Sequence, residues 1–495
     1  MNRQITRLAV AGVVLIAALI VATTYWQAWA APSLQDRQDN AIARVAQFQI
    51  DRGDIVNERA RVPLAVNQER KVKGNTFYFR KYPQAATTAH VVGYATQARS
   101  RAGLERSMNA YLTGSNSNLA TVLDTALDRL KGGTIHGNSI RLSLNLRAQR
   151  TALAALGKRC GAVVAIEPKT GRVLVHAQTP TYDPNLIETH FEAASRAPGA
   201  ECAPAAPLLV RATDGLYQPG STFKVVTASA AIDSGRFRLD STFQDPGYCE
   251  EYGKRVFNYS DQGTPSGYGT VNLAQAIQNS INSVFCNLGK QLGARTLVRY
   301  AKRFGFYERP PLETPDNERA PSGLYSKGEL FDPKDDNEVD PGRFAFGQER
   351  LLVTPMQMAM VAATIGNDGV LMEPHVVEKI VAPNGATIRT TRPKKIRDVV
   401  SKSTADAVTE GMKLAVRGGT STAAQIPGIE VAGKTGTAES GVNGVNTVSF
   451  ICFAPADDPK VAIAVFVERQ RATGGAVAAP IAKQVMEALL RSPSN

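Results

Sequence analysis

The longest uninterrupted apolar stretch lies at the start of the chain, where residues 8–26 contain no charged side chain. An α-helix needs about this length to cross the hydrocarbon core of a bilayer. Arg3 and Arg7 precede the stretch, and basic residues beside a membrane helix favour the cytoplasmic side. The pattern therefore predicts a single-pass protein of the cell membrane, with a cytoplasmic N-terminus and the rest of the chain, after the apolar stretch, outside the cytoplasm.

A cleaved signal peptide is the alternative, because residues 28–30 (Ala-Trp-Ala) resemble a cleavage site. The apolar stretch is long for the hydrophobic part of a signal peptide, which favours an uncleaved anchor. We predict that residues 1–30 form a cytoplasmic tip and a transmembrane anchor.

Apolar and alternating runs in the second part of the chain predict strands. Residues 161–168 and 172–178 are two such runs separated by a short turn, which is typical of a hairpin. Three more runs lie near the end of the chain, at residues 429–439, 447–455 and 460–469. We expect the hairpin and these three strands to join in one antiparallel sheet.

Helical patterns lie between and after these strands. Residues 274–293, 354–369 and 479–490 show such patterns. Residues 309–342 are rich in Pro, Asp and Glu, and we predict a long irregular insertion there. Helices packed on an antiparallel sheet make an α+β domain, to which we assign residues 141–495.

The region between the anchor and this domain has a different character. Residues 31–140 are polar, rich in arginine and weakly periodic, and they predict an extended stalk or a small accessory module. The glycine-rich segment 131–139 marks its end.

Composition narrows the class of protein. A hydrophobic fraction of 43% and a charged fraction of 20% are those of a folded chain. The formal net charge is +13, which suits an anionic surface such as lipid or an acidic polymer. The sequence has no zinc-finger spacing, basic zipper or aromatic RNA-binding signature, so we expect no nucleic-acid partner.

Cysteine usage fits an exported chain. Five cysteines permit disulfides, but the sequence does not pair Cys160, Cys202, Cys249 and Cys286. Cys452 lies in an apolar run and is predicted to be a buried free thiol. No two cysteines form a C-x-x-C pair, so a zinc site is not expected.

Candidate chemistry begins in residues 217–233, where a Pro-Gly turn leads into a helix with almost no polar face. Ser221 and Lys224 are three residues apart and share one side of that helix. A serine hydroxyl becomes a good nucleophile when a base takes its proton. Lys224 can be that base, because apolar neighbours and the positive end of the helix dipole both lower a lysine pKa. The alternative is that Ser221 only caps the helix.

A Ser-x-x-Lys pair is supported by helper motifs of the S-x-N and K-T-G types. K-T-G at residues 169–171 lies in the hairpin turn, where glycine serves the turn. The copy at residues 434–436 lies in a predicted strand whose glycines let another backbone approach closely. An edge strand that binds an extended peptide needs this close approach. S-x-N occurs at residues 107–109, 143–145 and 280–282, and only the last copy follows the Ser-x-x-Lys helix.

With these motifs the sequence resembles the class B penicillin-binding proteins, in particular the short PbpA-type members. The resemblance covers nearly the whole chain after the anchor, through a series of stretches in the family's order: QIDRGDI, RKYPQAATTAHVVGY, GLERSMNAYLTG, AIEPKTGRVLVHAQTPTYDPN, YQPGSTFK, FGQERLLVTPMQMA, VAGKTGTAE and GGAVAAP. It implies a penicillin-binding transpeptidase fold, an antiparallel sheet with helices on both sides, preceded by a stalk module and a single transmembrane helix.

The same resemblance implies a peptidoglycan D,D-transpeptidase, which cross-links stem peptides through a serine acyl-enzyme and is acylated and inhibited by beta-lactams. Ser221 would be the nucleophile and Lys224 its general base. Ser280 would relay a proton to the leaving amine, and Lys434 would tune Ser280 electrostatically. Asn282 would hold Lys224 and the substrate amide.

Substrate binding is implied at the K-T-G strand. Thr435, Gly436 and Thr437 would hold the substrate, the two threonines through its carboxylate. The backbone N–H groups of Ser221 and Thr437 would form the oxyanion hole. No metal or cofactor is implied. The segment 31–140 is too short for a glycosyltransferase module, so the resemblance implies a glycosyltransferase partner in the membrane.

Two stretches depart from the family pattern. VNERA follows RGDI where the family has an Asp-Arg-Asn-Gly-like turn, which affects the stalk. TVSF at residues 447–450 stands where the family commonly has His-Ala-Trp before the Phe, which affects the rim of the site.

The remaining alternatives are a D,D-carboxypeptidase, a serine beta-lactamase or beta-lactam sensor, and an inactive scaffold for wall synthesis. A Ser-His-Asp hydrolase is disfavoured, because Ser221 is not in a G-x-S-x-G turn and the five histidines form no paired motif. His375 is expected at the surface or at a helix cap.

Overall fold

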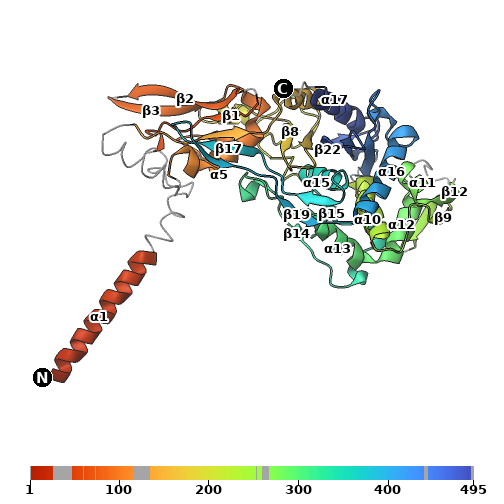
Figure 1. Ribbon diagram of the computed structural model, residues 1–495, viewed down its shortest axis with the longest axis horizontal. Helices are drawn as coiled ribbons and strands as arrows, with labels where there is room; N and C mark the ends of the chain where they lie inside the picture. Colours follow the sequence, from red (N-terminus) through yellow and green to blue (C-terminus); the bar gives the residue numbers. More distant parts are fainter. Residues whose placement is uncertain are drawn as a thin grey trace.

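The computed structural model describes residues 2–25, 47–59, 61–72, 74–115, 134–251, 253–258, 267–439 and 444–491. Helix α1 (Asn2–Thr24) contains an apolar stretch, Thr6–Thr24, that is long enough to cross a membrane. None of that stretch is buried within the protein, and Figure 1 shows α1 apart from the rest of the fold. The helix fits the predicted anchor, and the suggested cleavage site at residues 28–30 lies outside the described residues.

A five-stranded antiparallel sheet forms the centre of the larger part of the molecule, in the order β20-β21-β22-β7-β8. Its strands are β7 (Gly161–Ile166), β8 (Val173–Thr179), β20 (Ala432–Glu439), β21 (Asn446–Ala454) and β22 (Val461–Gln470). The pairing of β22 with β7 joins the end of the chain to the early hairpin. This confirms the sheet that the sequence predicted, and it leaves β20 at an edge.

Helices cover both faces of this sheet, because its strands are apolar on both sides. Val163, Val465 and Phe450 pack with α8 (Leu146–Leu156) and α17 (Ala478–Leu490). Their strand neighbours, such as Val164 and Phe466, face the other way into the main core. That core contains the helices α10 (Lys224–Asp233), α11 (Leu273–Gln278), α12 (Asn282–Leu292), α13 (Ala294–Arg303), α15 (Pro355–Ile365) and α16 (Lys402–Gly418).

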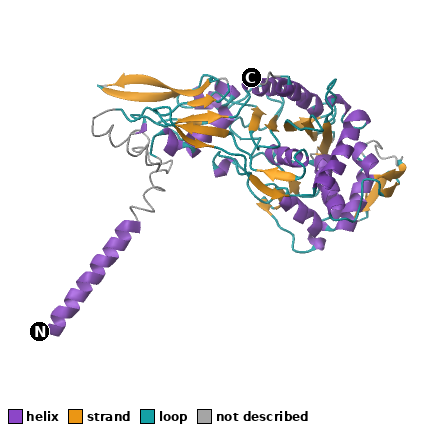
Figure 2. Cartoon of the chain, viewed as in Figure 1, coloured by secondary structure: helices purple, strands orange, loops and turns teal. Residues whose placement is uncertain are grey.

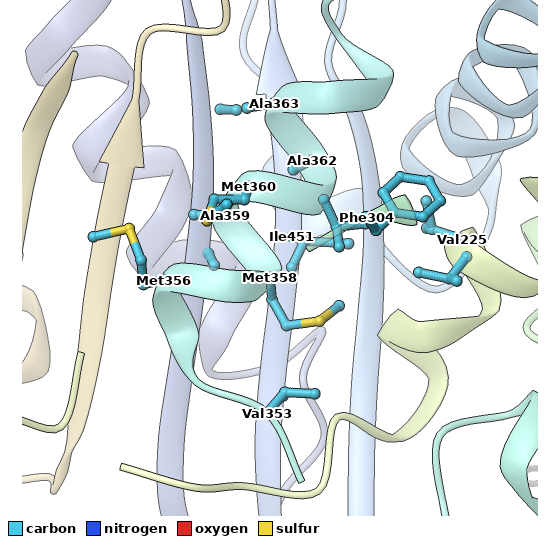
Figure 3. Packing of buried hydrophobic residues seen from close by; sticks show 14 of the residues in the cluster. Val225, Phe304, Val353, Met356, Met358, Ala359, Met360, Ala362, Ala363 and Ile451 are labelled. Atoms are coloured by element: carbon cyan, nitrogen blue, oxygen red, sulfur yellow. The ribbon is translucent and has the colours of Figure 1, made fainter. Parts of the chain in front are cut away.

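Helix α15 is the centre of the main core. All of its residues are buried, and Figure 3 shows its methionines and alanines between the sheet and the helix that carries Val225. Thr354 caps its N-terminus by accepting a hydrogen bond from the backbone N–H of Gln357. A helix that is apolar on every side is stable only when it is enclosed in this way.

The region after the anchor is a folded module built on a six-stranded sheet, in the order β18-β17-β6-β1-β2-β3. Its strands are β1 (Ile55–Asn57), β2 (Pro63–Val72), β3 (Asn75–Lys81), β6 (Ser139–Leu142), β17 (Val377–Val381) and β18 (Thr387–Thr390). Two of these strands come from much later in the chain, and Figure 1 shows β17 beside the early strands. The predicted boundary between residues 140 and 141 falls within β6.

This module buries a cluster of charged side chains beside its apolar core. Glu105 is fully buried between Arg52 and Arg80, with ion-pair distances of 2.8 and 2.6 Å. Arg52 Nη1 also donates to Asn109 Oδ1 at 2.8 Å. Because charged side chains occupy part of the interior, the apolar pattern along this part of the sequence is interrupted.

The remaining elements are short, and several surround the cleft described below; they are α4 (Ala89–Val92), α5 (Gly103–Ser107), α6 (Asn109–Leu112), α9 (Phe191–Ala194), α14 (Pro341–Ala345), β4 (Tyr94–Ala95), β5 (Arg101–Ala102), β9 (Thr242–Asp245), β10 (Tyr248–Glu251), β11 (Lys254–Phe257), β12 (Gly269–Asn272), β13 (Gly323–Ser326), β14 (Glu329–Leu330), β15 (Leu351–Leu352), β16 (Val370–Met372) and β19 (Lys395–Asp398). Figure 2 shows how loops connect them. Residues 309–342 are irregular except for β13, β14, two single-turn helices and the start of α14, much as the sequence predicted.

Two disulfides join Cys160 to Cys202 and Cys249 to Cys286. Cys452 is free and buried, which confirms its prediction.

Candidate active site

The serine of the Ser-x-x-Lys motif lies in a single helical turn, Gly220–Phe223, that leads directly into α10. Gly220 has φ of +52°, and a Cβ on it would lie 2.9 Å from the carbonyl oxygen of Thr437. Glycine is therefore required for this turn to approach β20 so closely. Ser221 is half-buried and lines the cleft beside it. Its hydroxyl makes no hydrogen bond to any described residue.

Lys224 is 1% exposed, and neutral groups surround its amine. Its Nζ lies 2.6 Å from the backbone oxygen of Ser280, 2.7 Å from Asn282 Oδ1 and 3.3 Å from Ser280 Oγ. The ring of Phe285 lies 5.2 Å away. The amine is thus fixed in place without a counter-charge.

Ser280 lies between two lysines. Its φ of +58° places it in the left-handed region, in the turn between α11 and α12. Lys434 Nζ donates to Ser280 Oγ at 2.8 Å, so that one hydroxyl contacts both amines. Asn282 begins α12, and its Nδ2 donates to the backbone oxygen of Phe257 at 3.0 Å, which fixes the side chain that accepts from Lys224.

The edge strand β20 forms one wall of the site. Lys434 is fully buried, whereas Thr435 and Thr437 line the cleft. A Cβ on Gly436 would lie 2.3 Å from Ser449 Oγ and 2.5 Å from the backbone oxygen of Pro219. Only glycine allows β20 to lie this close to the turn that carries the serine.

Both lysines have a lowered pKa. Burial, and then the charge of Lys434, lower the pKa of Lys224 well below its ordinary value. Burial lowers the pKa of Lys434 to about 7. No carboxylate of the described residues pairs with either amine, so nothing offsets the free-energy cost of burying the charged form of each lysine. The arrangement can supply a neutral amine beside a serine hydroxyl at physiological pH.

The structure thus brings together all the predicted site residues: Ser221, Lys224, Ser280, Asn282, Lys434, Thr435, Gly436 and Thr437. Ser221, Ser280, Asn282, Thr435 and Thr437 line a cleft of about 730 Å³.

The other motif copies lie elsewhere and have structural contacts. Lys169, in the turn between β7 and β8, is exposed and pairs with Asp458 at 2.7 Å. Asn145 caps α8 by accepting from the backbone N–H of Ala148. Asn109 belongs to the polar interior of the N-terminal module. The expectation for His375 was wrong: it is 5% exposed, because its backbone pairs with the turn at Gly171 and places the ring inside the fold.

Several cleft residues were missed by the sequence analysis. The Thr435 hydroxyl donates to Thr420 Oγ1 at 2.8 Å, and both hydroxyls line the cleft. Thr473 also lines it, as do Arg255 and Arg343. Thr420 follows a Gly-Gly pair, which was the one available local signal.

Metal ligation has little support in the described part of the chain. The two groupings of suitable side chains found there are Cys160, Cys202 and Glu468, and Cys249, Glu251 and Cys286. In each grouping the two cysteines form a disulfide with each other, so they offer no thiolate.

Comparisons with known proteins agree with this geometry. The family model "Penicillin binding protein transpeptidase domain" matches residues 161–487, and "Penicillin binding protein A dimerisation domain" matches residues 52–140. The chain is 36% identical to peptidoglycan D,D-transpeptidase PbpA of Mycolicibacterium smegmatis, over 100% of both chains. It is 34% identical to the protein of the same name from Mycobacterium tuberculosis, over 99% of both.

Solved structures give the same result. The chain resembles the ceftriaxone acyl-enzyme complex of penicillin-binding protein A from M. tuberculosis, with a TM-score of 0.78, 32% identity, and coverage of 90% of this chain and 100% of that one. It also resembles PBP2 of Pseudomonas aeruginosa in complex with WCK 5153, with a TM-score of 0.71, 30% identity, and coverage of 90% and 97%.

Proposed function

The chain belongs to the penicillin-binding protein transpeptidase family, and from that premise we propose that Ser221 is the nucleophile of a peptidoglycan D,D-transpeptidase. The observation that supports this assignment most directly is the environment of Lys224, a buried amine with neutral partners and a lowered pKa, one helical turn from a serine in the cleft. A base of this kind is what a serine nucleophile requires.

In the acylation step, neutral Lys224 takes the proton of the Ser221 hydroxyl while Oγ bonds to the carbonyl carbon of the penultimate D-alanine. The backbone N–H groups of Ser221 and Thr437 stabilise the oxyanion. The C–N bond then breaks as Ser280 gives its hydroxyl proton to the amine of the departing D-alanine. Ser280 takes in return the proton that Lys224 holds, so that Lys224 is neutral again. Ser280 is suited to this role because its hydroxyl contacts Lys224 and Lys434 together.

In the second step, an amine from a neighbouring stem peptide attacks the acyl-enzyme ester. Lys224 takes a proton from that amine as the new C–N bond forms. The ester C–O bond to Ser221 then breaks, and Lys224 returns the proton to Ser221 Oγ. Asn282 orients Lys224, and Thr435, Gly436 and Thr437 hold the donor along β20. A beta-lactam acylates the same serine, and its ring-opened product stays attached because no amine displaces it. The residues supply all of this chemistry without a metal or cofactor.

The test is intact mass of the full chain, purified in detergent, after incubation with benzylpenicillin. We expect one stable adduct on the wild type and none on Ser221→Ala, with thermal unfolding confirming that the variant is folded. An unreactive, folded wild type would favour the scaffold alternative. Rapid hydrolysis of the drug without an adduct would favour a beta-lactamase.

The carboxypeptidase alternative needs a separate measurement. A D-Ala-D-Ala donor peptide is incubated with the full chain, with and without an acceptor amine, and the products are separated by mass. A transpeptidase yields the cross-linked amide when the acceptor is present. Release of D-alanine with only the hydrolysed donor, at any acceptor concentration, would contradict the proposal.

We further propose that α1 spans the membrane with its N-terminus in the cytoplasm, and that a membrane glycosyltransferase supplies the glycan strands. Arg3 and Arg7 support the orientation, because they lie at the N-terminal end of the apolar stretch. Cysteine labelling in intact cells tests it: a cysteine introduced at residue 4 should be protected from an impermeant reagent, and one introduced at exposed Arg389 should react.

A further inference from the structure

The cleft has a second wall, on which two arginines come from separate parts of the chain. Arg255 lies on β11 and Arg343 on α14, and both line the cleft that contains Ser221. The guanidinium of Arg255 lies 4.3 Å from the ring of Tyr248 and pairs with no carboxylate of the described residues. Arg343 Nε lies 3.6 Å from Asp340 Oδ2, and its two terminal nitrogens make no hydrogen bond within the described chain. Both arginines therefore have donors to offer.

Both arginines are held on a common support, helix α12. The disulfide from Cys249 to Cys286 attaches β10, the partner strand of β11, to this helix. Next to this disulfide α14 packs so closely on α12 that a Cβ on Gly289 would lie 2.2 Å from the backbone oxygen of Pro341. Asn282, which contacts Lys224, is the first residue of α12. The backbone segments that carry the two arginines are thus held in place relative to the catalytic residues.

The charge of the cleft is unbalanced. Among the described residues that line it, Glu439 is the one acid, and it lies at the end of β20, whereas the arginines lie on β11 and α14. Guanidinium groups bind carboxylates through paired N–H donors, and the preference is strongest where water is partly excluded. The two arginines therefore offer an anion a place in the cleft apart from the threonines of β20.

We propose that Arg255 and Arg343 form a carboxylate subsite, and that the preferred acyl donor is a peptide with a free side-chain carboxylate before the scissile bond. The inference rests on the function proposed above, since it assigns the substrate class of that same site. It predicts that amidation of this carboxylate lowers the rate of acylation by the donor peptide. It also predicts that the two arginines raise the rate of acylation by beta-lactams with an acidic acyl side chain.

Benzylpenicillin and carbenicillin are matched probes, because carbenicillin is benzylpenicillin with one added carboxylate on its side chain. The measurement is the second-order rate constant of acylation of the full chain in detergent by each drug, and the readout is the carbenicillin-to-benzylpenicillin ratio. We expect this ratio to fall about threefold in Arg255→Gln and in Arg343→Gln, and about tenfold in the double variant, as for solvent-accessible charge pairs. Arg389→Gln removes an exposed arginine of β18, outside the cleft, and should leave the ratio unchanged.

The outcomes separate this inference from the proposed function. An unchanged ratio in the double variant would overturn the subsite while leaving the acyl-enzyme intact. An equal loss with both drugs would also overturn it, because it would show a structural effect of the arginines. Failure of both drugs to acylate the wild type would instead contradict the proposed function. Added salt provides a further check, since it should lower the ratio in the wild type and have less effect in the double variant.

Discussion

Two places in this molecule bury a pair of cations, and they differ in what lies between the two charges. In the N-terminal module the carboxylate of Glu105 lies between Arg52 and Arg80. In the cleft the hydroxyl of Ser280 lies between Lys224 and Lys434. Burial acts to raise the pKa of Glu105, but the charges of Arg80 and Arg52 outweigh it, so that its pKa lies below the ordinary value. The lysines have no such compensation, and burial lowers the pKa of each.

The comparison separates a structural use of buried charge from a catalytic one. Paired ions stay charged and hold segments of the module together, and breaking such a pair leaves an uncompensated charge. Amines buried with only neutral partners lose their protons easily, which reduces stability and produces a base. A perturbed pKa beside a cleft is therefore the stronger indication of function.

The largest expected effect comes from removing the base. Lys224→Met should lower the second-order rate constant of acylation by benzylpenicillin by about 10³-fold, a typical loss for a general base. The free energy of unfolding should stay the same or rise, because a desolvated amine is replaced by an apolar side chain of similar length. Stopped-flow acylation and chemical denaturation measure the two quantities. A variant that acylates at the wild-type rate would remove Lys224 from the mechanism.

At the buried ion pairs of Glu105 with Arg52 and Arg80, we expect a loss of stability without a loss of acylation rate. Glu105→Gln should lower the free energy of unfolding by about 3–5 kcal/mol, because two buried guanidiniums lose their counter-charge. The acylation rate of the molecules that remain folded should be unchanged. Denaturation curves test this, with Glu69→Gln as the control: Glu69 is 53% exposed and its ion pair with Lys71 is 3.9 Å long. A similarly small loss of unfolding free energy in both variants would show that the ion pairs of Glu105 do not stabilise the module.

The smallest expected effect is a dependence of stability on pH. Lys434 has a folded pKa of about 7, below its ordinary value of 10.5. Between these values the unfolded chain binds the proton that the folded chain has lost, so stability should rise with pH above about 7. From pH 7 to pH 9 the wild type should gain roughly 2 kcal/mol relative to Lys434→Met, since one pKa unit is worth about 1.4 kcal/mol. Equal slopes for the two proteins would show that Lys434 titrates normally in the folded chain.

Much of the catalytic sheet could be predicted from local patterns. The apolar runs of β7, β8, β21 and β22 are long, and a fully buried sheet makes them continuous. The short spacing of Ser221 and Lys224 on one helix could likewise be interpreted from neighbouring residues alone.

Other features depend on contacts between residues far apart in the chain. Nothing near Val377 indicates that β17 pairs with β6, and nothing near Cys249 indicates its bond to Cys286. The module that contains Glu105 was hard to recognise because its strands β1 and β6 are short and buried charged side chains interrupt its apolar pattern. Thr420 was missed because its role comes from a hydrogen bond to Thr435 on a different element.

The position of β17 also bears on how the chain reaches its folded form. Strand β6 lies between β1 and β17, and β17 begins at Val377, 235 residues after β6 ends at Leu142 (377 − 142). During synthesis the earlier strands emerge first, and one edge of β6 stays open until most of the chain has followed. An unpaired strand edge can pair with other chains, so the open edge of β6 must be kept from such pairing during export. Completion of this sheet is therefore a late step of biogenesis, and a chain truncated before residue 377 would lack it.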